Sequence, residues 1–160
     1  MIMHYLVSAI IEQLQLELST AVAAGQQAYD SATHSENIAD NKYDTLAVEA
    51  AYLAHGQSMR IAELQQSIAL YQHLHRPVFN AQSAIQLGAL IFIEDEQGQQ
   101  RRLFIGPAAG GLSVDSKHGS IQVITPASPL AQILMGKNVG DEIVWQMNQR
   151  KEFLSVVTIE

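Results

Sequence analysis

The sequence predicts an α+β protein in which an N-terminal antiparallel coiled-coil hairpin precedes a small antiparallel sheet domain with one short helix. All 4 Pro residues lie at or beyond Pro77, and only Gly25 and Gly56 of the 10 Gly residues come earlier. Before Pro77 apolar residues recur at helical spacing, whereas short β-type runs follow it. We therefore assign residues 1–76 to the hairpin and 77–160 to the sheet domain.

The first helix is expected from about Tyr5 to Ala32. Its apolar positions recur at steps of three, four or seven, which places them on one stripe of a helix. They are Leu6, Ile10, Leu14, Leu18, Ala21, Ala28 and Ala32. Small residues dominate the end of this stripe, so a partner helix can approach closely there and the arm is expected to be thin.

The second helix is expected to end at about Arg76, because proline disfavours helical geometry in the residue before it. Its apolar residues form two runs, Ala39-Tyr43-Leu46-Ala50-Leu53 and Ile61-Leu64-Ile68-Tyr71. The step of eight between the runs contains Gly56, which predicts a local change in helix packing. The polar link from Thr33 to Asn37 is short, so the two helices run antiparallel with the tip near residues 33–37.

Five short β-type runs follow Pro77, separated by Gly and Pro. They are 90–93, 102–105, 121–124, 143–145 and 153–157. One helix interrupts them. Ser128 can cap its N-terminus, Pro129 suits its first position and Gly136 can close it.

Composition excludes several classes of function. The chain has 160 residues, with Lys+Arg 9 against Asp+Glu 16, a formal net charge of -7 and Cys 0. Without cysteine there is no disulfide framework and no thiolate site. The acidic balance argues against bare DNA or RNA as the sole partner. The six His residues lack ligand spacing, so no metal site is expected in the free protein. No apolar stretch near the ~20 residues of a membrane span is evident, and we expect a cytoplasmic protein.

Acidic residues surround the predicted tip. Glu36, Asp40 and Asp44 follow one another at steps of four, which gives one acidic stripe on a helix. Like charges at this spacing oppose helix formation by ~0.2–0.5 kcal/mol per pair unless a cation or basic partner lies opposite. Two interpretations stay open, a solvated helix face and a contact site for a metal or cationic surface.

Two segments resemble the Gre-factor family, bacterial transcript-cleavage factors that bind RNA polymerase. Residues 128–143, SPLAQILMGKNVGDEI, resemble the family's S-P…G-K-x-x-G-D stretch. The tip Ser35-Glu36-Asn37 and the helix through Arg60-Ile61 resemble the family's tip and descending helix. From this resemblance the polymerase-binding candidates are Ser128, Pro129, Leu130, Gly136, Lys137 and Asp141.

The resemblance implies a coiled coil that enters the polymerase secondary channel and an FKBP-like domain seated at the channel mouth. Glu36, Asp40 and Asp44 would then help to hold a second Mg²⁺ at the polymerase active site. The polymerase itself performs the cleavage, so the protein is expected to be neither an enzyme nor the carrier of a cofactor. RNA contact is expected only inside the polymerase, and the protein is expected to be a monomer without membrane contact.

One departure from the family leaves alternatives open. The cleavage-competent tip reads D-x-x-E, and Thr33 stands where its Asp is expected. The protein is then either a cleavage stimulator or a non-cleaving occupant of the channel. A different class, an FKBP-like peptide-binding module or chaperone with prolyl isomerase activity, is a further alternative. A third is a module in which the long helices pair between chains.

Overall fold

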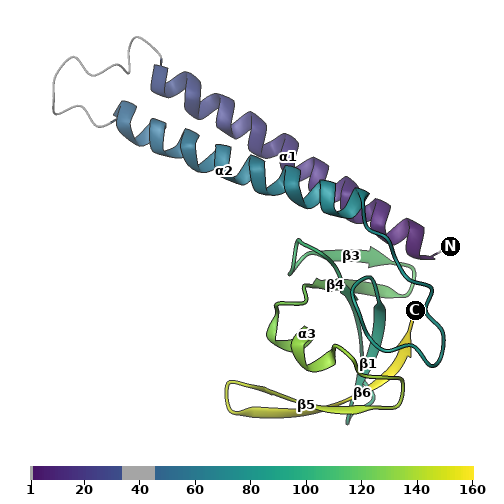
Figure 1. Ribbon diagram of the computed structural model, residues 1–160. Coiled ribbons are helices and arrows are strands. Elements are labelled where there is room, and N and C mark those ends of the chain that lie inside the picture. The colour runs from purple at the N-terminus through teal and green to yellow at the C-terminus, as the bar shows by residue number, and fades with distance from the viewer. Residues whose placement is uncertain (1, 34–45) are drawn as a thin grey trace. The chain divides into compact units, whose positions relative to one another are not determined.

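The computed structural model describes residues 2–33 and 46–160, which form two compact units. The hairpin unit is Val7–Ala69, and the sheet unit comprises Met1–Leu6 with Leu70–Glu160. Two long helices, α1 (Ile2–Thr33) and α2 (Leu46–Gln72), precede a six-stranded sheet with one short helix (Figure 1). The predicted α+β class and the order of hairpin and sheet are confirmed.

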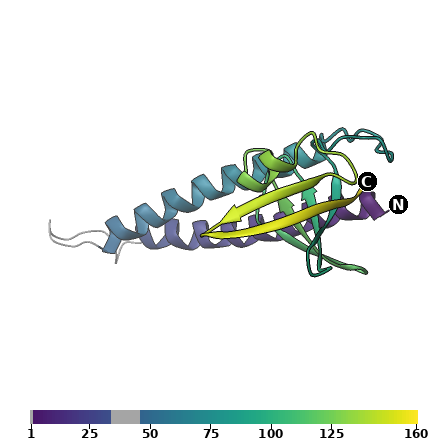
Figure 2. The ribbon, with the colours of Figure 1, turned by 90° about the horizontal axis from the view of Figure 1, so that it is seen from below.

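Helices α1 and α2 lie side by side and antiparallel (Figures 1 and 2). The seam residues of α2 are buried or half-buried and follow strict alternating steps of four and three: Ala50, Ala54, Gln57, Ile61, Leu64, Ile68 and Tyr71. The packing change predicted at Gly56 was therefore wrong. Leu53 is 64% exposed, and Ala54 with Gln57 continues the seam in its place.

Gly56 provides a first prediction. It lies inside α2, and a Cβ added there would meet nothing within 4 Å. Alanine is favoured over glycine in a helix interior by about 1 kcal/mol. Gly56→Ala is thus expected to raise the free energy of unfolding by about 0.5–1 kcal/mol, measured by urea denaturation. A loss of stability would show that the position is packed in solution.

Helix α2 ends at Gln72, four residues before the predicted end at Arg76. The side chain of Arg76 supplies the physical reason. Its Nε donates a hydrogen bond to the Gly88 carbonyl at 2.7 Å, and Nη2 donates to the Glu160 carbonyl at 3.2 Å. Its guanidinium also lies 5.7 Å from the ring centre of Phe79. These contacts fix the segment that leaves the helix.

The sheet has the strand order β3-β4-β2-β1-β6-β5. The strands are β1 (Leu90–Asp95), β2 (Gln100–Ile105), β3 (Ser113–Ser116), β4 (Gly119–Ile124), β5 (Glu142–Met147) and β6 (Arg150–Ile159). All pairs are antiparallel except β2 with β4, which corrects the prediction of a wholly antiparallel sheet. Strand β3 was not predicted, because Val114 is its only apolar residue.

The short helix α3 (Pro129–Leu134) covers one face of this sheet. Ala131 and Leu134 are fully buried in a cluster with residues from five strands, including Ile93, Leu103 and Val156. Trp145 and Phe79 pack on the same cluster from its margin. This core fixes the position of the loops on either side of α3.

Tyr71, the last seam residue of α2, belongs to the sheet unit. It is 1% exposed, and its hydroxyl donates a hydrogen bond to the Ala108 carbonyl at 2.7 Å. Gly106 makes room for it, because the hydroxyl occupies the place where a Cβ at Gly106 would lie. The contact joins the end of α2 to the loop after β2.

Burial raises the pKa of the Tyr71 hydroxyl well above its ordinary value of 10.0. The folded state therefore keeps this proton where the unfolded chain loses it, so stability falls as the pH rises above about 10, by about 1.4 kcal/mol per pH unit. Urea midpoints measured at about pH 9 and about pH 11 should show this drop. Tyr71→Phe should show a smaller drop, and an equal drop in both proteins would contradict the assignment.

Helix α1 is long and apolar enough over His4–Ser31 to meet the composition criteria for a membrane span. This was not expected from the sequence. Of this stretch 22% is buried within the structure, through residues such as Leu6, Ile10 and Leu14, whereas Leu16 and Val22 are exposed. One such helix is weak evidence for a membrane segment, because core helices of soluble proteins meet the same criteria.

Candidate partner-binding site

The predicted acidic tip lies outside the described residues. Glu36, Asp40 and Asp44 all fall in the segment 34–45, between the last residue of α1 and the first of α2. Thr33 is the final residue of α1. The role of the three carboxylates therefore stays a prediction. The described candidates lie separately in the hairpin unit and, around α3, in the sheet unit.

Ser128 and Pro129 begin α3 as the sequence predicts. Ser128 has extended backbone angles, and its hydroxyl accepts a hydrogen bond from the Ala131 N–H at 3.3 Å. Pro129 occupies the first turn, where its missing N–H costs nothing. Leu130 is half-buried and packs against the core. These three residues fix the start of the helix.

Backbone hydrogen bonds hold the C-terminal part of the motif, after α3. Gly136 has φ 82, and its N–H donates to the Ile85 carbonyl at 2.8 Å. The N–H of Ile85 donates in turn to the Lys137 carbonyl at 2.8 Å. Asp141 closes the following turn, because its carboxylate accepts a hydrogen bond from the Asn138 N–H at 2.8 Å.

The six candidates thus divide into two groups. Ser128, Leu130 and Asp141 are half-buried. Their side chains cap α3, pack against the core and close the following turn, respectively. Pro129, Gly136 and Lys137 are exposed, with Val139 39% exposed beside them. The second group therefore offers the more exposed surface to a partner. Sequence spacing alone could not separate the two groups, because both contribute to the same motif.

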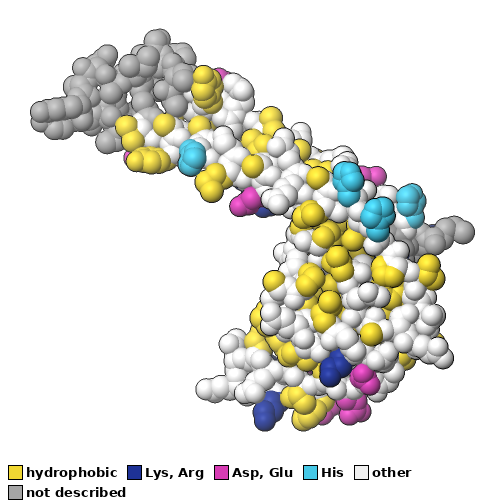
Figure 3. Space-filling model, in the orientation of Figure 1, with side chains coloured by type: hydrophobic (Ala, Val, Ile, Leu, Met, Phe, Trp, Pro, Cys, Tyr) yellow, Lys and Arg dark blue, Asp and Glu magenta, His cyan; other side chains and the backbone are white. Residues whose placement is uncertain are grey.

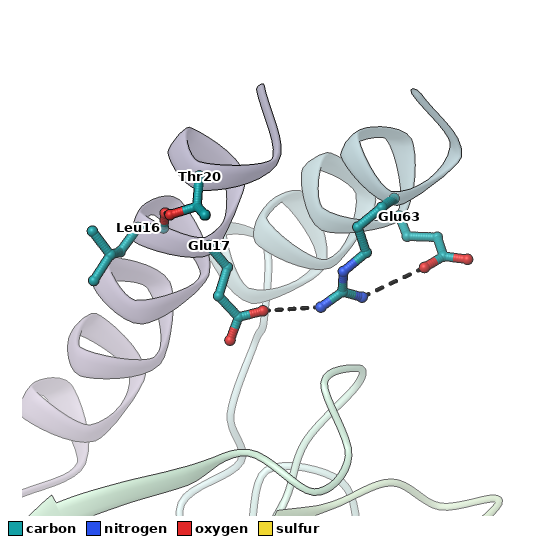
Figure 4. A network of polar contacts seen from close by, with 5 residues as sticks. Leu16, Glu17, Thr20 and Glu63 are labelled. Atoms are coloured by element: carbon teal, nitrogen blue, oxygen red, sulfur yellow. Dashed lines mark hydrogen bonds and ion pairs between the residues drawn. The ribbon is translucent and has the colours of Figure 1, made fainter. Parts of the chain in front are cut away.

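An ion-pair network joins α1 to α2 in the hairpin unit (Figure 4). Arg60 Nη2 lies 2.9 Å from Glu17 Oε2 on α1, and Nη1 lies 3.5 Å from Glu63 Oε2 on α2. All three side chains are at least 38% exposed, so each pair contributes about 1 kcal/mol or less. The family resemblance marks Arg60 in the sequence. Its partners could not be predicted, because Glu17 lies 43 residues away and Glu63 belongs to no motif.

Helices α1 and α2 approach each other closely at Gly25. A Cβ placed there would lie 3.3 Å from Gln57 Cβ and 3.6 Å from Ile61 Cδ1. Beyond this point the small side chains leave a shallow groove of about 380 Å³, lined by Ala24, Gln27, Ala28, Ser31, Glu49, Ala50, Leu53 and Gln57. Several hydrophobic side chains are exposed along these helices (Figure 3). The hairpin is a thin two-helix element, as predicted.

Residues 2–33 and 46–160 form no evident metal centre. No group of three or more His, Asp or Glu side chains within them could hold a metal ion. The aromatic side chains of the sheet serve separate purposes. Phe104 is 0% exposed, Trp145 packs on the core, and Phe92 lies under the guanidinium of Arg102.

The profile of the family described as transcription elongation factor, GreA/GreB, C-terminal, matches residues 80–160, about half of the chain. The chain belongs to the GreA/GreB family. The match covers β1 to β6 with α3 and includes all six motif residues from Ser128 to Asp141. The protein is therefore a member of a family of transcription elongation factors.

Solved structures are also similar to this GreA/GreB-family chain. One is the GreA factor homolog 1 (Gfh1) of Thermus thermophilus, with 20% identity, 94% coverage of both chains and a TM-score of 0.39. A GreA/GreB factor from Nitrosomonas europaea has 19% identity over 65% of this chain and 78% of its own, with a TM-score of 0.39. A search of the curated proteins finds no significant match.

Proposed function

We propose that this GreA/GreB-family protein binds RNA polymerase and inserts its helical hairpin into the secondary channel. The observation that carries the proposal is the family match of the sheet unit in a chain that also possesses two long paired helices. The 32 residues of α1 correspond to about 48 Å. That length, together with the close approach at Gly25, suits a narrow and deep cavity.

The sheet unit is proposed to seat at the channel mouth as an FKBP-like domain, with Pro129, Gly136 and Lys137 in contact with the polymerase. The hairpin would then carry Glu36, Asp40 and Asp44 toward the active site. Carboxylates are preferred ligands of Mg²⁺, and a second metal stabilises the attacking and leaving oxygens of phosphoryl transfer. The polymerase would perform the cleavage, and this chain would act as a cytoplasmic regulator.

A non-cleaving occupant of the channel is the second candidate. Thr33 stands where the cleavage-competent tip has Asp, and this is the specific observation that favours it. Both forms predict the same binding site on the polymerase. They differ in whether RNA is shortened.

A pull-down with RNA polymerase, followed by competition with an established secondary-channel binder, tests the proposal. We expect retention by the polymerase and displacement by the competitor. Lys137→Glu should weaken binding, whereas the exposed Lys117→Glu on the β3–β4 turn serves as the matched control. Retention that the competitor does not affect would argue against the channel.

A further inference from the structure

Arg102 is an arginine whose guanidinium meets no acceptor among the described residues. It lies in β2 and is half-buried. Its Nε is buried without a hydrogen-bond partner, and it forms no ion pair with any residue that the structure describes. Two other arginines differ, since Arg101 is paired with Glu152 and Arg76 donates to two carbonyls. Removing a cation from water without a partner is costly, so this guanidinium has a strong tendency to bind an anion.

Packing, rather than an acidic partner, holds this guanidinium in place. Arg102 is the cross-strand neighbour of Phe92 on β1, and its Cζ lies 5.2 Å from the centre of the Phe92 ring. Gly119 begins β4, the strand on the other side of β2, and has φ 113. A Cβ at Gly119 would lie 2.5 Å from Nη1 of Arg102. The guanidinium thus occupies space that a side chain at residue 119 would fill, and its direction is set in the free protein.

A carboxylate on the same face of the sheet is already used by another donor. Glu94 lies two residues beyond Phe92, diagonal to Arg102 and within reach of a long side chain. Its Oε2 instead accepts a hydrogen bond from Gln100 Nε2 at 3.3 Å. The Nη groups of Arg102 therefore stay available to an anion from outside the chain.

The β3–β4 turn adds a second cation beside Arg102 (Figure 1). Lys117 lies two residues before Gly119, is exposed, and forms no ion pair within the described part of the chain. Asp115 points to the opposite face, because side chains alternate along a strand and Ser116 pairs with Gly119. Two neighbouring cations without an acidic group between them favour an anion that carries more than one charge.

We propose that Arg102 is the centre of a binding site for a phosphate group. The phosphate oxygens accept hydrogen bonds from the Nη groups of Arg102, and Lys117 supplies the second positive charge. The planar fork of arginine matches phosphate geometry, and a phosphate group offers three acceptor oxygens with a charge of about −1.5 to −2. The phosphate of a small molecule and that of an RNA strand share this chemistry. The inference does not depend on polymerase binding.

Titration of the full chain with sodium phosphate near neutral pH, followed by nitrogen–proton NMR spectra, tests the inference. The side-chain Nε–H signal of Arg102 and the backbone N–H signal of Gly119 should shift and saturate, with a dissociation constant of about 1 mM. Arg102→Gln should weaken binding about 10- to 100-fold, and Lys117→Gln about two- to fivefold. Arg150→Gln is the matched control, since it removes an exposed cation from the β5–β6 turn, and it should leave the constant unchanged.

Two further probes and one variant complete the test. Acetate should bind about tenfold more weakly than phosphate, and equal affinities would overturn the inference. A short oligouridine that shifts the same signals identifies an RNA phosphate as the ligand, whereas a response to sodium phosphate alone identifies a small molecule. Arg102→Lys keeps the charge and the fold but lacks the fork, so it should bind more weakly than the unaltered protein. Unaltered affinity in this variant, or a phosphate titration that leaves the Arg102 signal in place, would overturn the proposal.

Discussion

Replacing Gly106 by alanine is expected to lower the free energy of unfolding of the sheet unit by about 2–4 kcal/mol. The added Cβ would occupy the position of the Tyr71 hydroxyl and lie 3.0 Å from Val123 Cγ1. Tyr71 and Val123 are both buried, so neither can move freely. Displacement of Tyr71 would also leave the Ala108 carbonyl without its hydrogen bond. The loss would appear as a lower urea midpoint.

A double-mutant cycle with Tyr71→Phe isolates the contact. Tyr71→Phe alone should cost about 1 kcal/mol through the lost hydrogen bond. In the Tyr71→Phe background the hydroxyl is absent, so Gly106→Ala should cost much less than it does in the unaltered protein. Additive costs in the two single variants and the double variant would show that the end of α2 does not pack on Gly106 in solution.

The second large effect is expected at the tip and rests on the proposed function. Glu36→Ala should slow RNA shortening in a backtracked elongation complex about 10- to 100-fold, as loss of a group that supports a metal does. Raising the Mg²⁺ concentration should recover part of the rate. Asp40→Asn and Asp44→Asn then identify the carboxylate that acts with Glu36.

Glu12→Ala is the matched control for these variants, since it removes one exposed carboxylate from α1 far from the tip. Its rate should equal that of the unaltered protein. If the unaltered protein shortens no RNA at any Mg²⁺ concentration, the cleavage form of the proposal is excluded and the non-cleaving form remains.

Local signals predicted much of the fold. The Ser128-Pro129 start of α3 could be predicted because capping and a missing N–H act within a few residues. The five predicted strands coincide with β1, β2, β4, β5 and β6 because each carries a run of β-branched or aromatic residues. Strand β3 lacks such a run, and its pairing with β4 depends on a long-range register instead.

Longer-range features could not be predicted, for physical reasons. The α2 seam passes through Ala54 and the polar Gln57, and an apolar pattern does not mark Gln57, while the larger apolar Leu53 is exposed. The end of α2 depends on Arg76 reaching the carbonyls of Gly88 and Glu160, up to 84 residues away. At the candidate site the motif identified the right segment, but only the structure separated Pro129 and Lys137 from the residues that hold the loop.

Site-specific crosslinking measures the central claim most directly. A photoreactive amino acid at Ser35, in the predicted tip, is placed in a complex with RNA polymerase, and the same group at the exposed Pro129 reports on the sheet unit. We predict that the label at Ser35 attaches to polymerase segments around the active-site Mg²⁺ and that the label at Pro129 attaches near the channel entrance. Attachment of the Ser35 label to the outer surface of the polymerase, with the Pro129 label still crosslinked, would contradict insertion of the hairpin.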